Sequence, residues 1–473
     1  MTYPQALAYL ETLVNYERQR RPRAMRAVRL ERMQRLCERL DLPQRKFRAI
    51  LVAGTNGKGS ICAMIYSMLR AAGVSVGLYT SPHLEDLRER IRVWPAGRQP
   101  SPGTDDGADW ISPEAFAEAL REVRRVLKSD PNLSGLGAPT HFEVLTAMAF
   151  VYFARQGVSV AVLEVGLGGR LDATNVVEPV VSVIGPIGLD HTDVLGEDVL
   201  AIAREKAGVM RAQGTTVIAA QDPAVSHVLR EMACAERGHL LEYGRDITAQ
   251  TLRHGPHEHG VAIRSPRGHY EDVSLSLIGR HQAENAALAV AAIETLAEEG
   301  IPYSAVRSGL AQAQWPGRLE LVRSDPLVVF DGAHNAQAAT ALRQTLEELW
   351  PDRRIRLVLG LSADKSVRDI GEVLAPIASA IACTASAHPR ALDPHTLAGR
   401  LRAFHERIDV IRDPVDAYTY VLNTAAPREI VVVTGSLFLV GQLRAMERRA
   451  SAQRPRARRM WSASLRRSTS CPS

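Results

Sequence analysis

The sequence predicts an α/β fold with two consecutive domains: an N-terminal P-loop domain with a parallel-rich sheet and a C-terminal Rossmann-like α/β domain. Three observations lead to this prediction. Apolar, strand-like runs alternate with helical segments from residue 48 onward, as in parallel sheets with crossover helices. A glycine-rich turn follows the first run and opens a helix. A second alternation of the same kind begins after a Trp-Pro-Gly interruption at residues 315–317.

The first alternation combines short apolar runs with helical segments. Two of these segments are long, Ser112 to Ser129 and Thr140 to Arg155, and another opens at the glycine-rich turn and runs to about Ala72. Parallel strands are covered by helices on both faces, so their sequences are continuous apolar runs. The predicted strands are Ile50 to Ala53, Val76 to Tyr79, Val158 to Glu164, Val180 to Ile184 and Thr215 to Ala219.

The second alternation follows the end of an alanine-rich helix that starts at Gln282. Its predicted strands are Leu327 to Phe330, Ile355 to Leu359, Ile377 to Thr384, Arg407 to Ile411 and Ile430 to Val433. We therefore divide the chain into an N-terminal α/β domain at 1–311, a linker at 312–317, a Rossmann-like domain at 318–447 and a tail at 448–473.

The composition is that of a globular protein, since 46% of the 473 residues are hydrophobic and 23% are charged. Disorder or a fibre is excluded for most of the chain. The longest apolar stretch, Val144 to Ala154, is well short of the ~18 residues that span a bilayer, and the N-terminus has no signal pattern. The five cysteines include no C-x-x-C pair, so no disulfide framework is encoded. We expect a cytoplasmic protein without a membrane partner.

The formal net charge of +6 arises at the C-terminal end. Residues 448–473 hold eight arginines and no acidic residue, and subtracting eight from +6 leaves −2 for the rest. This Ser/Arg/Pro-rich tail cannot bury enough apolar surface to fold, so we predict a disordered appendage. An RNA-binding or membrane-surface arm is the alternative, but arginine-rich tails of this kind are usually solvated. We therefore expect no nucleic-acid partner.

Two segments resemble insertions on this scaffold. Trp94 to Trp110 is rich in Pro, Gly and Asp and predicts a long exposed loop, and residues 246–275 predict a hairpin excursion. The second segment carries four histidines, which raises the alternative of a metal site. No cysteine or clear carboxylate cluster accompanies them, and loop histidines of this kind are usually solvated. They are His254, His257, His259 and His269.

The strongest local signal is the glycine-rich turn Gly54-Thr55-Asn56-Gly57-Lys58-Gly59-Ser60 between an apolar strand and a helix. Glycines let backbone N–H groups turn toward a phosphate, and the helix N-terminus adds partial positive charge. Lys58 can reach the β- and γ-phosphates, and the Ser60 hydroxyl can face Mg²⁺. The spacing departs from G-x-x-x-x-G-K-[ST], so a purely structural glycine turn is the alternative.

Two polar residues, Glu164 and His191, follow buried strand-like runs of the same predicted sheet. Carboxyl ends of parallel strands meet at one edge, where ligands bind, and Lys58 and Ser81 should lie there too. Burying a carboxylate is unfavourable unless it binds a cation. The alternatives are a helix-capping role for Glu164 and a hydrogen-bonded turn histidine at His191.

The glycine-rich turn resembles the ATP loop of the folylpolyglutamate synthase/dihydrofolate synthase family, part of the Mur ligase superfamily. Further segments resemble the family in the same chain order, and together they extend over residues ~3 to 446. They are Tyr79 to Leu84, Thr140 to Glu143, Leu163 to Asn175, Leu189 to Thr192, Glu205 to Gly208, His281 to Asn285, Pro316 to Arg318, Asp331 to Asn335 and Thr434 to Leu437. The fold that this resemblance implies is a P-loop ATPase domain followed by a glutamate-ligase domain.

The resemblance implies the metal and catalytic residues. Ser81, Glu164 and His191 would bind magnesium, with the Ser60 hydroxyl as a further ligand and two Mg²⁺ ions expected. Lys206 alone would be interpreted as an exposed helix lysine, but similar ligases carry a carbamate (N6-carboxylysine) there that helps to hold the second ion. The implied catalytic residues are Lys58, Lys206 and His334.

The nucleotide site of similar enzymes is divided between the two domains, so closure is expected before chemistry. Arg318 would meet phosphate oxygens and Asp331 would accept from ribose hydroxyls. The implied ATP contacts are Thr55, Asn56, Gly57, Lys58, Gly59, Ser60, Asn285, Arg318 and Asp331. Each of these residues could also have a purely structural role. Asn285 could cap a helix, Arg318 could be a surface arginine, and Asp331 could cap the helix at Asn335.

The substrate residues also come from the resemblance. Asp172 could accept from a pterin N–H edge, and Phe142 could pack on a ring. The implied pteroate or folate contacts are Thr140, His141, Phe142, Glu143, Leu171, Asp172 and Ala173, and those of the incoming glutamate are His334 and Ser436. One departure concerns the acceptor loop, because Arg29 stands where the family usually carries glycine.

The implied activity is ATP-dependent addition of L-glutamate to 7,8-dihydropteroate and to reduced folylpolyglutamates through an acyl phosphate, giving ADP and phosphate. The expected partners are these small molecules, and the expected state is a monomer. A monofunctional folylpolyglutamate synthase is one alternative. A cell-wall Mur ligase is another, but only 53 residues precede Gly54, about the lower limit for a domain. A non-catalytic nucleotide-binding regulator is disfavoured because the residues of the site are all present.

Overall fold

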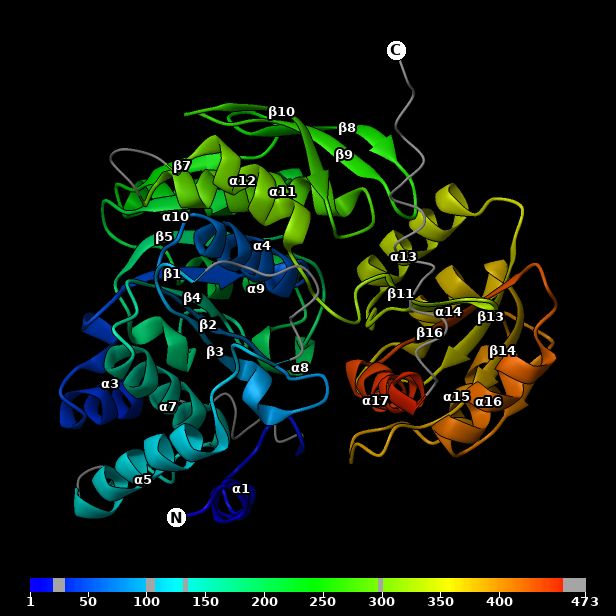
Figure 1. Cartoon of the computed structure of the whole chain (residues 1–473), viewed down its shortest axis with the longest axis horizontal. Helices are drawn as coiled ribbons and strands as arrows, with labels where there is room; N and C mark the ends of the chain where they lie inside the picture. The colour runs from blue at the N-terminus through cyan, green and yellow to red at the C-terminus, as the bar shows by residue number, and fades with distance from the viewer. Residues whose placement is uncertain (20–29, 99–106, 131–134, 297–300, 454–473) are drawn as a thin grey trace.

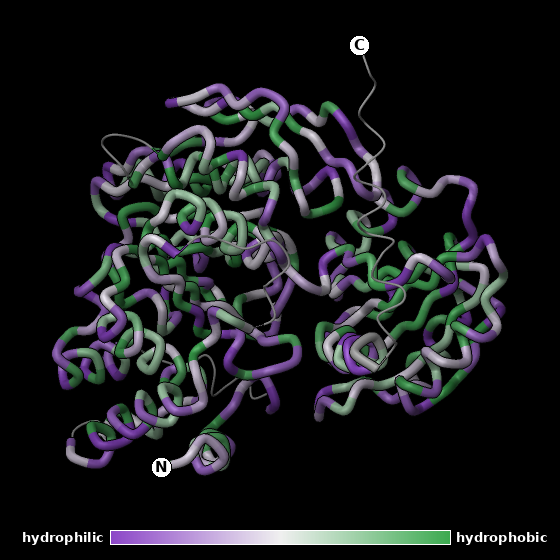
Figure 2. The backbone as a smooth tube through the Cα atoms, viewed as in Figure 1, coloured by the Kyte–Doolittle hydropathy of each residue, from purple (hydrophilic) through white to green (hydrophobic). Residues whose placement is uncertain are grey.

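The computed structural model describes residues 1–19, 30–98, 107–130, 135–296 and 301–453, and it consists of two α/β domains (Figure 1). Each domain has a largely parallel sheet covered by helices on both faces, as the alternation of runs predicted. Apolar segments lie along the central strands of both domains (Figure 2). The predicted fold class is therefore confirmed.

The N-terminal domain contains a seven-stranded sheet of order β3-β2-β4-β1-β5-β6-β7. All neighbouring strands are parallel except β3, an edge strand that pairs antiparallel with β2. Strand β4, whose five residues are all buried, lies beside β1, so Glu164 at its end stands next to the glycine-rich turn. The strands are β1 (Arg48–Ala53), β2 (Val76–Tyr79), β3 (Ile91–Trp94), β4 (Val160–Glu164), β5 (Pro179–Ile184), β6 (Thr215–Ile218) and β7 (His239–Glu242).

Helices form two separate apolar layers around this sheet. The layer that contains α4, α11 and α12 also includes a small second sheet, and the opposite layer contains the remaining long helices. The helices are α1 (Tyr3–Glu11), α3 (Leu30–Arg39), α4 (Lys58–Ala71), α5 (Pro113–Ser129), α7 (His141–Arg155), α8 (Thr192–Leu195), α9 (Val199–Ala207), α10 (Pro223–Ala235), α11 (His281–Glu294) and α12 (Tyr303–Gln312), with 3-10 turns η1 (Pro43–Arg45), η2 (Leu87–Arg90) and η3 (Ala173–Val176).

The two predicted insertions differ from the sequence interpretation. Residues 246–275 form two successive hairpins, β8 (Thr248–His254), β9 (His259–Arg264) and β10 (His269–Leu275), rather than one. This small sheet gains its apolar face by packing on α11 and α12, a contact that local sequence cannot reveal. His257 and His269 are exposed, and the described parts of the chain hold no cluster of three or more His, Cys, Asp or Glu suited to a metal.

The ends of the other insertion are not an exposed loop. Trp94 is 3% exposed at the end of β3, and the strand-like bridge between Arg92 and Trp110 brings the chain back to the sheet. Arg70 and Arg98 both lie against the Trp94 ring, with their guanidinium carbons 3.9 and 4.2 Å from its centroid. The middle of the predicted loop, 99–106, lies outside the described residues.

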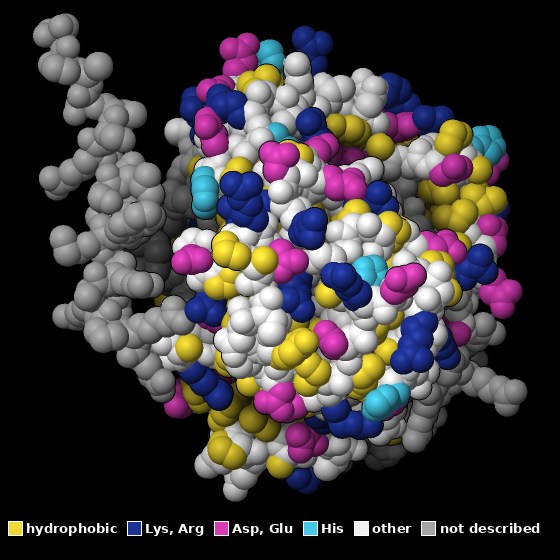
Figure 3. All heavy atoms as spheres, turned by 90° about the vertical axis from the view of Figure 1, so that its right-hand side faces the viewer, with side chains coloured by type: hydrophobic (Ala, Val, Ile, Leu, Met, Phe, Trp, Pro, Cys, Tyr) yellow, Lys and Arg dark blue, Asp and Glu magenta, His cyan; other side chains and the backbone are white. Residues whose placement is uncertain are grey.

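The C-terminal domain contains a six-stranded sheet of order β11-β12-β16-β13-β14-β15, parallel apart from its edge strand β11. Both signs of charge are interspersed on its outward face (Figure 3). Its elements are β11 (Glu320–Ser324), β12 (Leu327–Phe330), α13 (Ala336–Leu349), β13 (Arg354–Leu359), α14 (Val367–Leu374), η4 (Ala375–Ile377), β14 (Ala378–Cys383), α15 (Pro394–Leu401), β15 (Ile408–Val410), α16 (Pro414–Thr424), β16 (Glu429–Thr434) and α17 (Leu437–Gln453).

The last helix extends beyond the predicted start of the tail. Helix α17 ends at Gln453, so the first six residues assigned to the tail are helical, and Arg448 contacts Glu85 of the N-terminal domain at 3.5 Å. The reason is that α17 carries an apolar face into the C-terminal core, which the arginine count alone conceals. Residues 454–473 lie outside the described part of the chain. Within that part, no helix combines the length and apolarity that crossing a membrane requires.

Candidate active site between the two domains

Two adjoining pockets lie between the domains, at the carboxyl ends of the strands of both sheets. The nucleotide-side pocket is lined by the glycine-rich turn after β1, by residues after β4 and β5, and by Arg318 and Asp331 of the second domain. The acceptor-side pocket, of about 440 Å³, is within the usual size range of small-molecule sites. Both are lined by Ser81, Gly166–Gly168 and His191, so these residues mark the point where the pockets meet.

The glycine-rich turn has the geometry that an anion site needs. Gly57 has a φ of +79°, and a Cβ atom there would lie 2.6 Å from Asn285 Oδ1. A Cβ on Gly59 would lie within 2.5 Å of the indole of Trp315, so the linker packs directly on the start of α4. Both positions therefore require glycine. The absence of side chains here brings the backbone close to whatever occupies the pocket.

Two lysines meet at the carbonyl of Gly54. Lys58 Nζ donates to the carbonyl oxygens of Gly54 and Thr55, at 3.1 and 3.2 Å. Lys206 Nζ, which is buried, donates to the same Gly54 oxygen at 2.8 Å. Burial, reinforced by the charge of Lys58, lowers the pKa of Lys206 to about 7. Lys206 is therefore not the exposed helix lysine that its local sequence suggests, and much of it is an uncharged amine near neutral pH.

The four candidate magnesium ligands all line the nucleotide-side pocket. The backbone N–H of Ser81 donates to Glu164 Oε2 at 3.1 Å, which ties the end of β4 to the loop after β2. Burial raises the pKa of Glu164. Burial also lowers the pKa of His191 to about 4, which keeps its imidazole neutral, the form that binds a metal. The fourth, Ser60, is buried and within 3.4 Å of Gln282 Nε2.

These donors fit a hard divalent cation. A carboxylate, hydroxyl oxygens and one neutral imidazole line the pocket, and phosphate oxygens and water would complete the coordination of a bound ion. His191 itself adopts a left-handed backbone conformation, with φ +51°, at the start of α8. Such a conformation is unfavourable for a non-glycine residue and is typical of functional sites. A cation bound here would also offset the cost of burying Glu164.

The second domain contributes Arg318 and Asp331 to the same pocket. Asp331 accepts from the backbone N–H groups of Leu319 and Ala333, at 2.9 and 2.8 Å, and burial raises its pKa although Arg318 opposes this effect. The helix that follows is capped by Asn335 instead, whose side chain accepts from Ala338. The structural alternative for Asp331, that it caps this helix, is therefore wrong. The carboxylate fixes the loop on which Arg318 stands.

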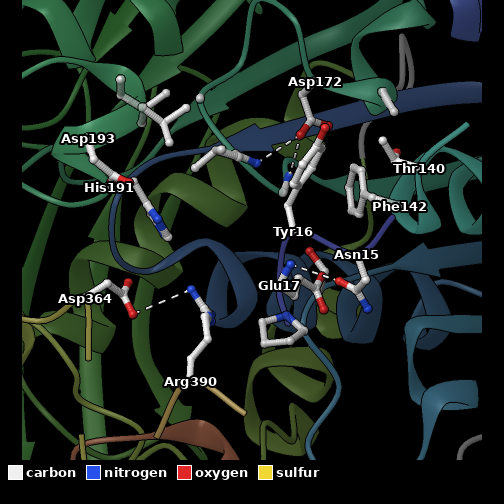
Figure 4. A pocket seen from close by; sticks show the side chains of 18 of the residues that line it. Asn15, Tyr16, Glu17, Thr140, Phe142, Asp172, His191, Asp193, Asp364 and Arg390 are labelled. Carbon is white, nitrogen blue, oxygen red and sulfur yellow. Dashed lines mark hydrogen bonds and ion pairs between the residues drawn. The ribbon is translucent and has the colours of Figure 1, made fainter. Parts of the chain in front are cut away.

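The acceptor-side pocket has an apolar end formed by Tyr16, Leu30, Met33, Phe142 and Leu171. Thr140, Glu143, Asp172 and Ala173 line it as well. His141 is buried beneath it, beside Arg90 and Glu17, and does not line it. Phe142 and Asp172 face the same space in Figure 4. The sequence-predicted acceptor residues are thus brought together, with His141 as the exception.

Two carboxylates of this pocket are already engaged by the protein. Asp172 accepts from the N–H groups of Gly166, Leu167 and Thr174 and from the Thr174 hydroxyl. Glu143 pairs with Arg32 at 2.7 Å and caps α7 together with Thr140. Asp172 therefore shapes the loop that follows β4, and a pterin N–H would have to share an oxygen that already accepts two hydrogen bonds.

The opposite end of the pocket is charged and belongs to the second domain. His334 and Ser436, the predicted glutamate contacts, line it, and so do residues that the sequence interpretation missed: Asp364, Lys365 and Arg390. They follow β13 and β14, which run parallel to β16 in the order β16-β13-β14, so they lie at the same carboxyl edge as Ser436. Their position after predicted strands was the available signal, because none of them belongs to a recognisable segment.

Arg390 and Asp364 face each other across this end without a close hydrogen bond (Figure 4). The distance from Arg390 Nη1 to Asp364 Oδ1 is 3.6 Å. Asp364 Oδ1 and Arg390 Nε are both buried without a hydrogen-bond partner in the described structure. The loop is held firmly, since Ala363 N donates to Arg390 O at 2.8 Å. Unsatisfied buried donors and acceptors on a rigid loop are typical of a polar ligand site.

Asp190, next to His191, joins the two domains. It accepts from Lys365 at 2.6 Å and lies 3.7 Å from His334 Nε2, both residues of the second domain. Burial would raise the pKa of Asp190, but the neighbouring His191, Lys365 and His334 hold it well below its ordinary value. Asn56 in the glycine-rich turn also bonds Gln337 of α13 at 2.7 Å. Both pockets are therefore closed by direct contacts between the domains.

Comparisons with known proteins agree with this geometry. Residues 126–293 match the family described as "Mur ligase middle domain", and residues 317–437 match "Mur ligase, glutamate ligase domain". The chain is 36% identical over 420 residues to the dihydrofolate synthase/folylpolyglutamate synthase of Bacillus subtilis, covering 87% of this chain and 93% of the relative. It is 36% identical to the Mycobacterium tuberculosis protein of the same name, covering 94% and 95%.

Solved structures are similar over almost the whole chain. Mycobacterium tuberculosis folylpolyglutamate synthase complexed with ADP has a TM-score of 0.83 at 34% identity, covering 94% of this chain and 98% of that one. Escherichia coli FolC in complex with DHPP and ADP has a TM-score of 0.82 at 29% identity, covering 96% and 99%. The bifunctional Yersinia pestis enzyme complexed with AMPPNP and a Mn ion has a TM-score of 0.79 at 28% identity, covering 94% and 98%.

Proposed function

This chain belongs to the dihydrofolate synthase/folylpolyglutamate synthase family of Mur ligases, which confirms the resemblance of its motifs, and on that premise we propose its reaction. It is an ATP-dependent ligase that adds L-glutamate to 7,8-dihydropteroate and to reduced folylpolyglutamates. The single observation that carries this proposal is the meeting of two pockets at Ser81, Gly166–Gly168 and His191. One pocket suits a nucleotide, and the other has an apolar end for a pterin and a charged end for an amino acid.

The two pockets would hold ATP, the acceptor and L-glutamate in separate places around the point where the pockets meet. The acceptor's carboxylate would lie where the pockets meet, and the γ-phosphoryl of ATP would be transferred to it, giving an acyl phosphate and ADP. The amine of glutamate would then attack the acyl carbon from the charged end, and phosphate would leave with formation of the amide and loss of a proton. Closure between the domains, held by Asp190 and Asn56, would exclude water from the acyl phosphate.

ATP and magnesium are the cofactors of this proposal, with two ions expected. Bound magnesium would neutralise charge on the phosphates and on the attacked carboxylate. Glu164, His191, Ser81 and Ser60 would hold metal, and Lys58 with the glycine-rich turn would hold phosphate. Arg318 would contact phosphate oxygens, Asn285 lines the pocket from α11, and Asp331 lines it while also fixing the loop at Leu319.

We expect activity to depend on carbon dioxide through Lys206. A carbamate forms only on an uncharged amine, and the lowered pKa of about 7 supplies that form, so carbamylation should fall as the pH drops below about 7. Turnover in CO₂-depleted buffer should rise when bicarbonate is added, and at equal dissolved CO₂ the increase should be smaller below pH 7 than above it. Lys206→Met should lose about 10²-fold in kcat. Carbon NMR with labelled bicarbonate should show a carbamate signal in the wild type alone.

An unmodified wild type that is fully active without CO₂ would contradict the carbamate. Lys46→Met is the matched control, because Lys46 is half-exposed and pairs with Asp41 on the surface at 2.7 Å. Its bicarbonate response should equal that of the wild type.

We expect Arg390 to recognise a carboxylate of the incoming glutamate. Arg390 lines the charged end of the acceptor-side pocket, and its Nε has no hydrogen-bond partner in the described structure. Charge-assisted hydrogen bonds of an arginine to a carboxylate are strong. Arg390→Gln should raise the KM for L-glutamate roughly 10- to 100-fold, and the KM values for ATP and for the acceptor should change little. Steady-state kinetics with each substrate varied in turn would measure this.

Arg412→Gln is the matched control, since Arg412 also lies near the end of a strand of this sheet but is exposed and pairs with Asp393 at 2.9 Å. The assignment of Arg390 would be wrong if its KM for glutamate stayed at the wild-type value while the protein remained folded.

The proposed function is tested with purified protein, Mg²⁺-ATP and L-glutamate, with dihydropteroate and tetrahydrofolate in separate reactions and products identified by mass. Addition to both acceptors establishes the bifunctional enzyme. Addition to tetrahydrofolate alone identifies a monofunctional folylpolyglutamate synthase. If neither acceptor is extended while ATP binds, the proposed function is wrong.

We further propose that the protein acts as a monomer in the cytoplasm, on small molecules and without nucleic-acid or membrane partners. The two domains of one chain supply both sides of each pocket, so the site needs no second copy. Size-exclusion chromatography with light scattering would reveal an oligomer and contradict the monomer.

A further inference from the structure

Arg90 is a buried arginine that the proposed reaction does not use. It ends the 3-10 turn η2, and its side chain is 1% exposed. Its guanidinium donates from Nη1 and Nη2 to the two carboxylate oxygens of Glu17, at 2.9 and 2.5 Å, and from Nε to His83 Nδ1 at 3.1 Å. Three N–H donors of the one planar guanidinium are thus used, two of them by Glu17 and the third by His83.

One direction leads to the wall of the acceptor-side pocket. Residues 14–17, which we call the wall segment, line that pocket and follow α1 without regular secondary structure of their own beyond a single bridge at Val14. His141 N donates to Val14 O at 2.9 Å, and Glu17 N donates to Asn15 Oδ1 at 2.9 Å. Arg90 holds the far end of the segment through Glu17. Figure 4 shows Asn15, Tyr16 and Glu17 together on this side of the pocket.

The other direction leads to Ser81, a candidate metal ligand. The carbonyl of Arg90 accepts from the N–H of Thr80 at 3.1 Å, and its Nε donates to His83. Arg90 therefore contacts the residues on both sides of Ser81-Pro82, and the N–H of Ser81 points to Glu164. The loop with the metal ligand and the wall of the acceptor pocket are joined through one side chain.

We propose that Arg90 is a positioning residue that sets the wall segment relative to the Ser81 loop, so that an acceptor seated on the wall presents its carboxylate at the metal site. Arg90 touches neither substrate and acts through Glu17 on one side and His83 on the other. The inference rests on the proposed function, because it assigns the wall to the acceptor and Ser81 to magnesium. A misplacement of about 1 Å between such groups is enough to reduce a rate about 10²-fold.

The planar guanidinium, with N–H donors pointing toward two partners at once, explains why arginine is needed at position 90. A lysine at position 90 would keep the positive charge that Glu17 needs, but its single ammonium cannot reach Glu17 bidentately and His83 at once. Arg90→Lys should therefore loosen both attachments while leaving the buried carboxylate with a cation. Glu17→Gln should loosen only the wall, and His83→Phe should loosen only the Ser81 loop.

The test combines kinetics with amide hydrogen exchange. Glu17→Gln should raise the KM for the acceptor about 10-fold with the Mg²⁺ dependence unchanged. His83→Phe should raise the Mg²⁺ concentration at half-maximal rate with the acceptor KM unchanged. Arg90→Lys should do both and lower kcat. Added to Glu17→Gln, Arg90→Lys should give no further rise in acceptor KM. The matched control is Arg88→Lys, because Arg88 lies in the same turn but is partly exposed and pairs with Asp86.

Hydrogen exchange supplies a readout that needs no turnover. Arg90→Lys should speed exchange at residues 14–19 and at residues 80–84 together, whereas Arg88→Lys should change neither. A folded Arg90→Lys variant that leaves both segments and both kinetic constants at wild-type values overturns the inference, and so does a uniform rise in exchange across the N-terminal domain. If the wild type fails to extend either acceptor, the proposed function fails, and the exchange result still decides whether Arg90 couples the two segments.

Discussion

Replacing Lys58 with alanine should reduce ATP-dependent ligation by about 10³-fold or more without unfolding the protein. Lys58 is the cation of the glycine-rich turn, and its Nζ bridges the carbonyl oxygens of Gly54 and Thr55 inside the nucleotide-side pocket. A bound γ-phosphate would draw the ammonium away from these carbonyls. The positive charge of the ammonium would then stabilise the negative charge that shifts during phosphoryl transfer. Rapid-mixing or steady-state assays with saturating glutamate and acceptor would measure the loss in kcat.

The variant should stay folded because Lys58 lies at the first position of α4, and its side chain is not part of the buried core. A thermal melt near that of the wild type would establish this. Lys46→Ala is the control, since Lys46 is a surface lysine from the same domain. An active, folded Lys58→Ala variant would show that the turn is only structural and would remove the basis of the nucleotide site.

The order of strands and helices was predictable because each parallel strand is a continuous apolar run. The run at Val76 to Tyr79 matches β2 residue for residue, and the turn before Lys58 lies between β1 and α4 as expected. The edge strands β3 and β11 were not predicted. Charged residues interrupt both strands, Arg92 in β3 and Glu320 and Arg323 in β11, so neither is the continuous apolar run by which the central parallel strands were predicted.

The site was predictable where its residues belong to recognisable segments, and not where a side chain acquires its role from contacts between loops. Lys58, Glu164 and His191 follow strands of one sheet, so their neighbourhood follows from topology. Arg390 and Asp364 meet only because the loops after β13 and β14 bond to each other. Asp172 was assigned to the pterin from its chemistry, but four protein donors already use its carboxylate.

Glu164→Gln should abolish turnover, with a loss of about 10³-fold or more, while leaving the protein without nucleotide as stable as the wild type or more stable. Glu164 is buried at the end of β4, and burial raises its pKa because the ionised form is disfavoured there. A neutral amide of the same shape removes that unfavourable charge and removes the anion that a divalent cation needs. Activity and stability should therefore change in opposite directions.

The decisive measurement is the melting temperature of each form with and without Mg²⁺-ATP, recorded beside the turnover rate. Ligand binding to the folded state raises the melting temperature of the wild type, and the rise should be much smaller in Glu164→Gln because the metal contact is lost. Glu178→Gln, at an exposed acid that precedes β5, should keep both the rise and the turnover. A Glu164→Gln protein that keeps the full rise would place the metal on other ligands. One that melts well below the wild type without ligand would instead make Glu164 a structural carboxylate, whose hydrogen bond from Ser81 holds the loop in the absence of any cation.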